Sequence, residues 1–361
     1  MRFVTYTEKL TTPRVRPSTL TPLADERIGL HTGPMGSGKI IDLHQAWTAL
    51  FSHEELRLLG SFPRDMSEFL LDQEKWTSAA QQVQNRISTG EIPESCIRDE
   101  AKVRLLSPIP RPISMRDGYA FRQHVEAARR NRGVPMIPEF DQFPIFYFTN
   151  HLAVTGPGEI PVEPLAREQL DFELEVAVVI GKTARNLKAV EADDAIFGYM
   201  VMNDWSARKL QMDEMKLNLG PAKGKDFATS LGPYLVTRDE LKSSAIPSPS
   251  GERHGLSMKT WVNGKQVSEG NLKDMTWTFA QILERASYGV TLHPGEVIGS
   301  GTVGTGCFLE LNGSKITDNQ WLHPGDEVVM EVEGLGRLVN VIRASEEVTR
   351  EVREETLARL K

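Results

Sequence analysis

The sequence predicts an α+β protein in which a small N-terminal α+β domain precedes a larger, β-rich domain. With 361 residues, the chain is long for one compact core and short for three. Beyond residue 113, apolar runs bounded by glycine and proline recur, as is typical of strands. Only a few helical stretches interrupt these runs, so we expect helices packed outside a β core rather than a regular βαβ array.

The N-terminal domain is expected to combine short strands with one long helix. Strands are predicted at Arg2–Tyr6, Arg27–Leu30 and Lys39–Leu43. A helix is predicted over Met66–Val83, because Asp65 can cap it, Glu68 follows three residues later, and apolar residues share one side. Residues 107–114 carry three prolines and must be extended, so we place the boundary between domains 1–106 and 107–361 there.

The larger domain is expected to contain many strands and few helices. The predicted strands are Ile145–Phe148, Glu173–Ile180, Ile196–Met202, Tyr234–Val236, Leu256–Val262, Glu296–Ser300, Cys307–Leu311 and Glu327–Val332. The predicted helices are Asp117–Arg132, Trp277–Ala286 and Ala344–Lys361. We expect the last of them to cap the fold or a partner subunit.

Composition and charge exclude several classes of protein. A net charge of −7 without a basic block argues against a nucleic-acid partner. Cys96 and Cys307 lack CxxC spacing and are too few for a disulfide framework, which suits a reducing compartment. No secretory signal is visible, and no stretch approaches the roughly 18 apolar residues of a membrane helix. We therefore expect a cytoplasmic protein that does not bind membranes.

Two glycine-rich segments resemble nucleotide-binding loops without their context. Residues 33–39, GPMGSGK, precede Ile40, where a phosphate-binding loop needs Ser or Thr. A turn between two strands is the better interpretation. Residues 299–304, GSGTVG, match a dinucleotide-binding pattern that requires a following helix. Because residues 307–311, CFLEL, are predicted to be a strand, we reject this motif too.

An acidic strand is the most informative local feature. In LDFELEVAVVI, residues 170–180, the acids Asp171, Glu173 and Glu175 alternate with apolar residues, so they would share one face of a strand. Three carboxylates above an apolar core repel one another unless water or a cation neutralises them. A divalent cation with oxygen ligands would hold them there. Taken alone, however, the charged outer face of a half-exposed strand is the better explanation.

Four further segments contain residues that could do chemistry. Asp117 and His124 are seven residues apart, and on a helix they would share nearly the same face, about 10 Å apart. The other segments are residues 202–208 with Asp204 and Arg208, residues 220–230 with Lys225, and residues 299–311 with Thr302 and Glu310. Each alone also fits a structural role: a surface helix, a salt bridge, a plain loop or a turn.

The order and spacing of these segments are specific. The patterns DxYxxRQH, LDxELE, MNDWSAR, GKxF, and SGT followed by LEL occur in this order between residues 113 and 340. Together they resemble the fumarylacetoacetate hydrolase family. The resemblance implies a large mixed β-roll for residues 107–361 and a homodimer. Residues 1–106 resemble the accessory domain of the family only loosely.

The resemblance also implies a set of functional residues. One divalent cation per subunit, Mg²⁺ or Ca²⁺, would be held by the carboxylates of Asp117, Glu173, Glu175 and Asp204. His124, paired with Glu310, matches the group that activates water. Arg208, Gln211 and Lys225 match groups that bind the developing oxyanion. Tyr119, Tyr147 and Thr302 match groups that position the carbonyls or carboxylate of the substrate.

The implied activity is metal-dependent hydrolysis of a carbon–carbon bond in a small anionic β-diketo acid of the fumarylacetoacetate or acylpyruvate type. The segment between Thr302 and Glu310 is shorter than in the mammalian-type enzyme, and Asp213-Glu214 follow Gln211 where that enzyme is more aromatic. The substrate therefore stays open.

Three alternatives remain. A 2-oxo acid decarboxylase or hydratase could use the same metal, but the presence of both His124 and Glu310 favours a hydrolase. The chain could also be a non-catalytic, metal-stabilised binding protein. Finally, the four carboxylates could form only a surface acidic patch, in which case Mg²⁺ would not change the melting temperature.

Overall fold

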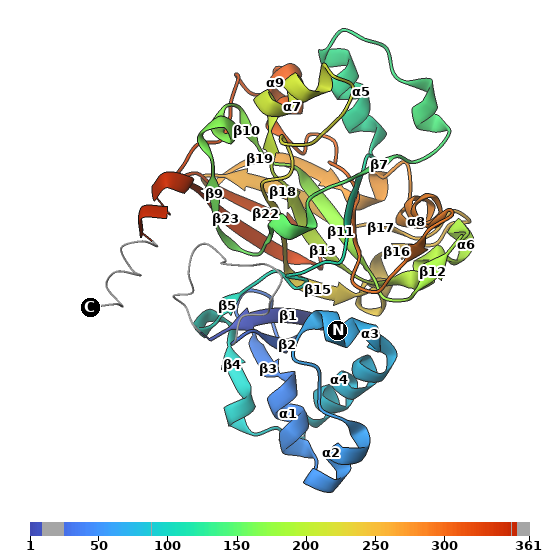
Figure 1. The fold of residues 1–361 in the computed structure, drawn as a ribbon, viewed down its shortest axis with the longest axis vertical. Coiled ribbons are helices and arrows are strands. Elements are labelled where there is room, and N and C mark those ends of the chain that lie inside the picture. The colour runs from blue at the N-terminus through green and yellow to red at the C-terminus, as the bar shows by residue number, and fades with distance from the viewer. Residues whose placement is uncertain (9–24, 88, 348, 352–361) are drawn as a thin grey trace.

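Two packed sheets form the core of the protein. The computed structural model describes residues 1–8, 25–87, 89–347 and 349–351. Figure 1 shows a small N-terminal part, coloured blue to cyan, below a larger part. One sheet has twelve strands and the other five, and both contain parallel as well as antiparallel pairs. The predicted α+β fold with a large mixed β-roll is therefore confirmed.

The N-terminal part contains the three strands predicted for it and two more. The strands are β1 (Arg2–Thr7), β2 (Arg27–Thr32), β3 (Lys39–Asp42), β4 (Ile97–Asp99) and β5 (Arg104–Leu105). The helices are α1 (Leu43–Leu50), α2 (His53–Leu59), α3 (Met66–Leu71) and α4 (Gln73–Ile87). Residues 33–38 form the turn between β2 and β3, which pair antiparallel, as predicted.

The helix predicted over Met66–Val83 is in fact two helices, because the chain leaves helical geometry at Asp72 (φ −135°, ψ 56°). The predicted cap is present: the Asp65 carboxylate accepts a hydrogen bond from the Glu68 amide at 2.9 Å. The break lets aromatic residues of both α3 and α4 contact the ring of Phe62. Tertiary packing thus divides a segment whose apolar pattern alone favours continuity.

The twelve-stranded sheet runs through both parts of the chain. Its order is β4-β3-β2-β1-β15-β13-β11-β21-β6-β7, with β5 on β1 and β8 on β15. Its strands in the larger part are β6 (Met115–Gly118), β7 (Phe146–Phe148), β8 (Val154–Thr155), β11 (Leu174–Ile180), β13 (Ile196–Asp204), β15 (Thr229–Thr237) and β21 (Val297–Gly299). Because β1 pairs with β15, the N-terminal strands extend this sheet. The domain boundary at residue 106 stays a prediction.

The five-stranded sheet covers one face of the central strands. Its order is β19-β18-β22-β23-β9, from β19 (Lys265–Asn271), β18 (Ser257–Val262), β22 (Glu327–Val332), β23 (Gly336–Ala344) and β9 (Gly158–Val162). Met258 packs in one apolar cluster with Val176 and Val201 of the central strands. On the opposite face, Met200 packs with Phe3 of the N-terminal part. Strands β11 and β13 are therefore buried on both faces.

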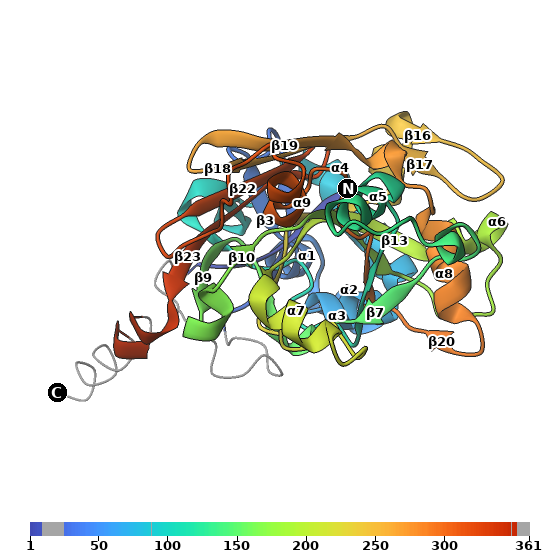
Figure 2. The same ribbon diagram turned by 90° about the horizontal axis from the view of Figure 1, so that it is seen from above.

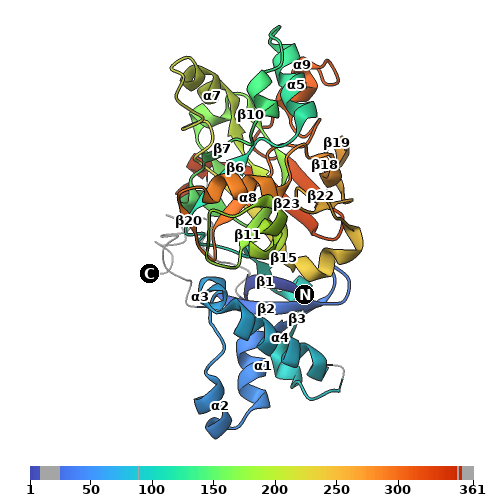
Figure 3. The same ribbon diagram turned by 90° about the vertical axis from the view of Figure 1, so that its right-hand side faces the viewer.

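Short sheets and helices complete the larger part. The short strands are β10 (Leu170–Asp171) with β14 (Ser206–Ala207), β12 (Ala184–Arg185) with β20 (Thr291–Leu292), and β16 (Ala245–Ile246) with β17 (Arg253–His254). The helices are α5 (Arg122–Asn131), α6 (Ala189–Ala192), α7 (Arg208–Met215), α8 (Phe279–Ser287) and α9 (Phe308–Gly313). Helices α5, α7 and α9 gather at the end opposite α2 (Figures 1 and 3), and Figure 2 looks onto that end.

The helix predicted at Asp117–Arg132 was placed wrongly at its start. It begins only at Arg122, and Asp117 lies on strand β6, opposite Gly299 of β21. The long-range pairing with β21 decides this conformation, and the local pattern does not reveal it. Asp117 and His124 are therefore not on one helix face.

The strand predicted at Cys307–Leu311 was wrong, because these residues begin helix α9. The buried carboxylate of Asp171 accepts hydrogen bonds from the amides of Phe308 and Leu309 at 2.7 and 2.9 Å. A carboxylate at this position stabilises the first turn of a helix. A helix therefore does follow GSGTVG, but Asp171 already occupies the amides to which a pyrophosphate would bind.

Three further observations concern the ends and the surface. Ala344 ends β23, residues 345–347 are helical, and the predicted C-terminal helix beyond residue 351 lies outside the described residues. None of the helices in the described ranges is long and apolar enough to span a bilayer. Cys96 and Cys307 are both buried and unpaired.

Candidate active site

Four carboxylates carried on or directly beside three strands of the twelve-stranded sheet meet inside the larger part. Asp117 lies on β6, Glu175 on β11, Glu173 directly before β11, and Asp204 at the end of β13. One oxygen of each lies within 4.8 Å of the others, and all four residues are buried. A Cβ at Gly299 would lie 2.4 Å from the Asp117 carboxylate, so glycine there leaves room for the acid. The interpretation of these residues as a surface patch is therefore wrong.

The charges in this cluster are only partly balanced. Burial first, and then the charge of Asp204, raise the pKa of Asp117 to about 7. Burial and the charge of Asp117 hold the pKa of Glu175 well above its usual range, and burial raises that of Asp204. For Glu173, the opposing charges of Lys225 and Arg208 outweigh burial and lower the pKa.

The cluster fits a hard divalent cation. Glu175 Oε2 and Asp204 Oδ1 are buried and have no hydrogen-bond partner within the described residues. Four carboxylates, two with a vacant oxygen, form the oxygen-only donor set that Mg²⁺, Mn²⁺ or Ca²⁺ prefers. A bound cation would also offset the burial and the mutual repulsion that raise the pKa of three of the acids.

Asp171 does not join the cluster, although the sequence placed it on the same face. Residues 172 and 173 interrupt the predicted strand, with β10 ending at Asp171 and β11 beginning at Leu174. Besides capping α9, the Asp171 carboxylate accepts a hydrogen bond from Arg208 Nε at 2.9 Å. Its role is therefore to hold Arg208 and the start of α9.

We expect Asp171→Ala to lower the free energy of unfolding by about 3–5 kcal/mol, since it leaves the buried Arg208 guanidinium without this partner and uncaps α9. Urea unfolding in chelator measures the effect. The matched control is Asp213→Ala, because Asp213 is exposed and paired with Lys209 and Lys216. This substitution should change the free energy of unfolding by no more than about 0.5 kcal/mol. Equal effects of the two substitutions would contradict the assignment.

A histidine–glutamate dyad lies next to the carboxylates. His124 on α5 and Glu310 on α9 are buried, and Nδ1 lies 2.7 Å from Oε2 of Glu310. The other oxygen of Glu310 accepts the Thr305 amide at 2.9 Å, which fixes the carboxylate. A carboxylate only accepts, so Nδ1 carries the proton and Nε2 keeps a lone pair. The ring of Tyr119 packs edge-on at 5.9 Å from His124.

The two predicted positively charged side chains, Lys225 and Arg208, bind carboxylates of the cluster directly. Lys225 Nζ donates to Asp204 at 2.7 Å and also to Glu173. Arg208 donates to Glu173 at 2.7 Å and to the side-chain oxygen of Gln211 at 3.0 Å. Although burial opposes it, the charges of Asp204 and Glu173 hold the pKa of Lys225 above its usual range. Lys225 is thus a fixed positive charge.

The remaining predicted residues also reach the carboxylates. The Tyr147 hydroxyl donates to Asp204 Oδ2 at 2.5 Å. The Thr302 hydroxyl lies 3.4 Å from Glu175 Oε1. The structure therefore brings every predicted site residue into one connected region, while their catalytic roles stay predictions.

Sequence reasoning missed two residues of this region. The side chain of Asn203 accepts the Glu173 amide at 3.0 Å and fixes the chain just before β11. Asn203 lies within the MNDWSAR segment, so its position beside Asp204 was the available signal. Cys307 offers its sulfur beside His124 and Glu310, and nothing in its sequence context indicated this.

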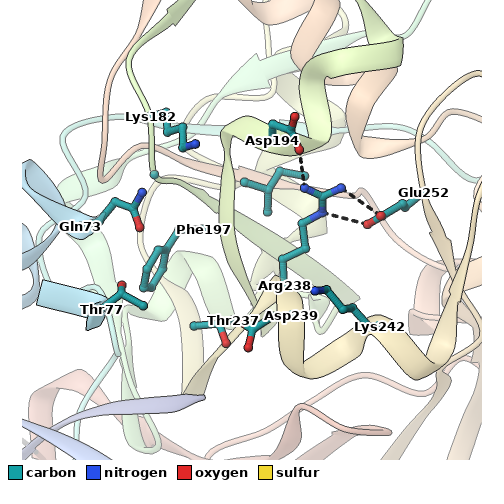
Figure 4. Close-up of a pocket in the computed structure, with 12 residues that line it drawn as sticks. Gln73, Thr77, Lys182, Asp194, Phe197, Thr237, Arg238, Asp239, Lys242 and Glu252 are labelled. Atoms are coloured by element: carbon teal, nitrogen blue, oxygen red, sulfur yellow. Dashed lines mark hydrogen bonds and ion pairs between the residues drawn. The ribbon is translucent and has the colours of Figure 1, made fainter. Parts of the chain in front are cut away.

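A separate cavity of about 360 Å³ lies between α4 and the ends of β13 and β15 (Figure 4). In it, Arg238 forms ion pairs with Glu252 at 2.9 Å and Asp194 at 2.7 Å. None of the predicted site residues is among those that line it. The buried reactive groups, and not this cavity, define the candidate active site.

Comparisons with known proteins find similar chains. The family profile described as fumarylacetoacetate (FAA) hydrolase C-terminal matches residues 114–343. Oxaloacetate tautomerase YisK of Bacillus subtilis is 28% identical over 84% of this chain and 93% of its own length. Fumarylacetoacetase of Oryza sativa is 29% identical over 74% of this chain and 76% of its own. These relatives are enzymes.

One solved structure adds a metal to the comparison. Maleylpyruvate hydrolase from Sphingobium sp. SYK-6, in complex with manganese(II) and pyruvate, superimposes with a TM-score of 0.62. The two sequences are 18% identical, and the match covers 95% of this chain and 99% of that one. The likeness shows a shared fold, and in that fold one protein binds a divalent metal.

Proposed function

The chain belongs to the fumarylacetoacetate hydrolase family, and on this premise we propose that it is a metal-dependent hydrolase that cleaves a carbon–carbon bond in a β-diketo acid. The single observation that carries the proposal is the buried His124–Glu310 hydrogen bond beside four clustered carboxylates. An oriented imidazole is what activation of water requires. Decarboxylation needs no activated water, so a decarboxylase would have no use for the dyad.

The residues of this chain supply the steps of hydrolysis. A divalent cation held by Asp117, Glu173, Glu175 and Asp204 would stabilise negative charge on the substrate oxygens. His124 Nε2 takes a proton from the water that attacks the carbonyl, while Glu310 stabilises the resulting imidazolium. Arg208 and Lys225 lie beside this site and stabilise the oxyanion.

Bond cleavage then returns the proton. The carbon–carbon bond breaks, its electron pair stays on the leaving carbon as an enolate, and a proton must be added there. The imidazolium of His124 carries the proton taken from water, and delivering it to this carbon returns the dyad to its starting state. The ammonium of Lys225 is the alternative donor.

A second candidate is keto–enol tautomerisation of a 2-oxo diacid. It is favoured by the similarity to the oxaloacetate tautomerase over most of both chains. The same imidazole could move a proton between carbon and oxygen without adding water. The cation and the positive charges of Arg208 and Lys225 suit an anionic substrate in both cases.

A substrate panel tests these proposals. Fumarylpyruvate, acetylpyruvate, fumarylacetoacetate and oxaloacetate are each followed by NMR with Mn²⁺ or Mg²⁺ and with chelator. Metal-dependent formation of two acids supports the hydrolase, and accelerated enol–keto exchange without cleavage supports the tautomerase. Release of CO₂ would favour the decarboxylase alternative, and a hydrated product would favour the hydratase.

The expected homodimer also stays a proposal, and light scattering tests it.

A further inference from the structure

The thiol of Cys307 is a buried reactive group that the proposed hydrolysis does not use. It stands at the start of α9, and its sulfur, a ring nitrogen of His124 and an oxygen of Glu310 all lie within 4.8 Å of one another. Cys307 is completely buried, whereas His124 and Glu310 are 6 and 4% exposed. The thiol therefore lies next to the dyad and is shielded from solvent.

A role as a nucleophile does not fit this thiol. Burial first, and then the charge of Asp171, hold the pKa of Cys307 well above its usual range. Nucleophilic cysteines instead have a lowered pKa and partial exposure. The protonated thiol is inert until something displaces its proton.

A zinc ion is the partner that this donor set fits. Thiolate sulfur, imidazole nitrogen and carboxylate oxygen are the ligands of protein zinc sites, and three protein ligands leave one position open for water. The neighbouring cluster offers only carboxylate oxygens, which prefer harder ions. The chain thus carries two donor sets of different hardness next to each other.

The change needed at the dyad is small. His124 Nδ1 and Glu310 Oε2 are 2.7 Å apart, as in a hydrogen bond. Two ligands of a tetrahedral zinc ion, each bound at about 2.1 Å, lie about 3.4 Å apart. Moving these two atoms apart by less than about 1 Å would therefore let both of them bind one zinc ion.

We propose that Cys307, His124 and Glu310 form a second metal site, selective for Zn²⁺, whose occupation inhibits the enzyme. Zinc displaces the thiol proton, which passes to solvent. When zinc binds Nδ1 of His124, the ring proton moves to Nε2, so no lone pair remains to accept a proton from water. Zinc on Nε2 would occupy that lone pair directly. The inhibition rests on the proposed function, but the site itself does not.

Zinc binding is measured first, independently of turnover. With Mg²⁺ in large excess to fill the four-carboxylate cluster, calorimetry should find one Zn²⁺ per chain in the wild type. Cys307→Ser and Cys307→Ala should weaken this binding at least about tenfold. The control is Cys96→Ser, at the other buried cysteine, which should bind zinc like the wild type. X-ray absorption of the wild type should show one sulfur at about 2.3 Å from zinc.

Turnover supplies the second readout. Zinc should inhibit the wild type and Cys96→Ser equally, and Cys307→Ser should need at least about tenfold more zinc while its zinc-free turnover stays unchanged. Equal zinc binding by wild type and Cys307→Ser, or a zinc spectrum without sulfur, would overturn the proposal. The proposal would also be overturned if Cys307→Ser folds but has no turnover in the absence of zinc. If no substrate is turned over, the proposed function fails, but the binding data still decide the zinc site.

Discussion

Glu175→Gln is expected to lower metal-dependent turnover strongly and also to raise the melting temperature of the metal-free protein. The pKa of Glu175 lies well above its usual range because of burial and the charge of Asp117. A neutral amide of the same shape avoids the free-energy cost of protonating this buried carboxyl, or of keeping it charged beside three other acids. The same change removes a cation ligand, and losing several kcal/mol of charge stabilisation lowers turnover at least about 10²-fold.

The pH dependence of this effect has a definite sign. A carboxyl whose pKa is raised by folding adds stability below its unfolded-state pKa and loses it as the pH rises through its folded-state pKa. For Asp117 the folded-state pKa is about 7, against about 4 when unfolded. In chelator, the wild-type melting temperature should therefore fall between about pH 4 and pH 7. The fall should be smaller for Glu175→Gln and smaller still for wild type with Mn²⁺.

Melting curves with chelator and with Mn²⁺ at several pH values measure both effects. Glu327→Gln, at an exposed glutamate on β22, is the control and should follow the wild type. The explanation by charge crowding is contradicted if metal-free Glu175→Gln melts below the wild type at pH 8. Unchanged stabilisation of Glu175→Gln by Mn²⁺ would contradict the cluster as the metal site.

Local sequence patterns predicted the strands of the site well and their surroundings poorly. The alternation around Glu173 and Glu175 predicts one strand, and the apolar run that leads to Asp204 predicts another. The structure contains both strands. The same alternation is expected for a charged outer face, and these acids are buried only because both faces of β11 are covered by other parts of the chain. Whether a charged face meets water or other acids depends on strands distant in the chain.

The wrong predictions have the same physical cause. Asp117 is in a strand because it pairs with β21, more than 180 residues away. The CFLEL segment is a helix because Asp171, 137 residues earlier, binds its first amides. A short apolar run fits a strand or a buried helix equally well. The spacing of motifs across the whole chain carries the resemblance to a family, and this resemblance is what identified the site residues as one set.

His124→Asn is expected to lower turnover about 10²–10⁴-fold, the usual contribution of a positioned general base. Asparagine is shorter than the imidazole and cannot accept and return a proton. Because His124 is not one of the four clustered carboxylates, stabilisation by Mn²⁺ should be unchanged. Glu310→Gln, combined with His124→Asn, should add little further loss, since the two residues act as one unit. Single-turnover rates with saturating metal measure the chemical step.

The chain provides a matched control for this test. His31 is also buried and lies 3.0 Å from a carboxylate, that of Glu100, but in the N-terminal part. His31→Asn should lower the melting temperature, because it disrupts a buried pair, and the folded fraction should keep its turnover. Equal losses of turnover in the two variants would mean that any buried histidine–carboxylate pair matters only for stability. Metal-dependent turnover that survives in folded His124→Asn would remove the dyad from the mechanism and favour a decarboxylase or hydratase.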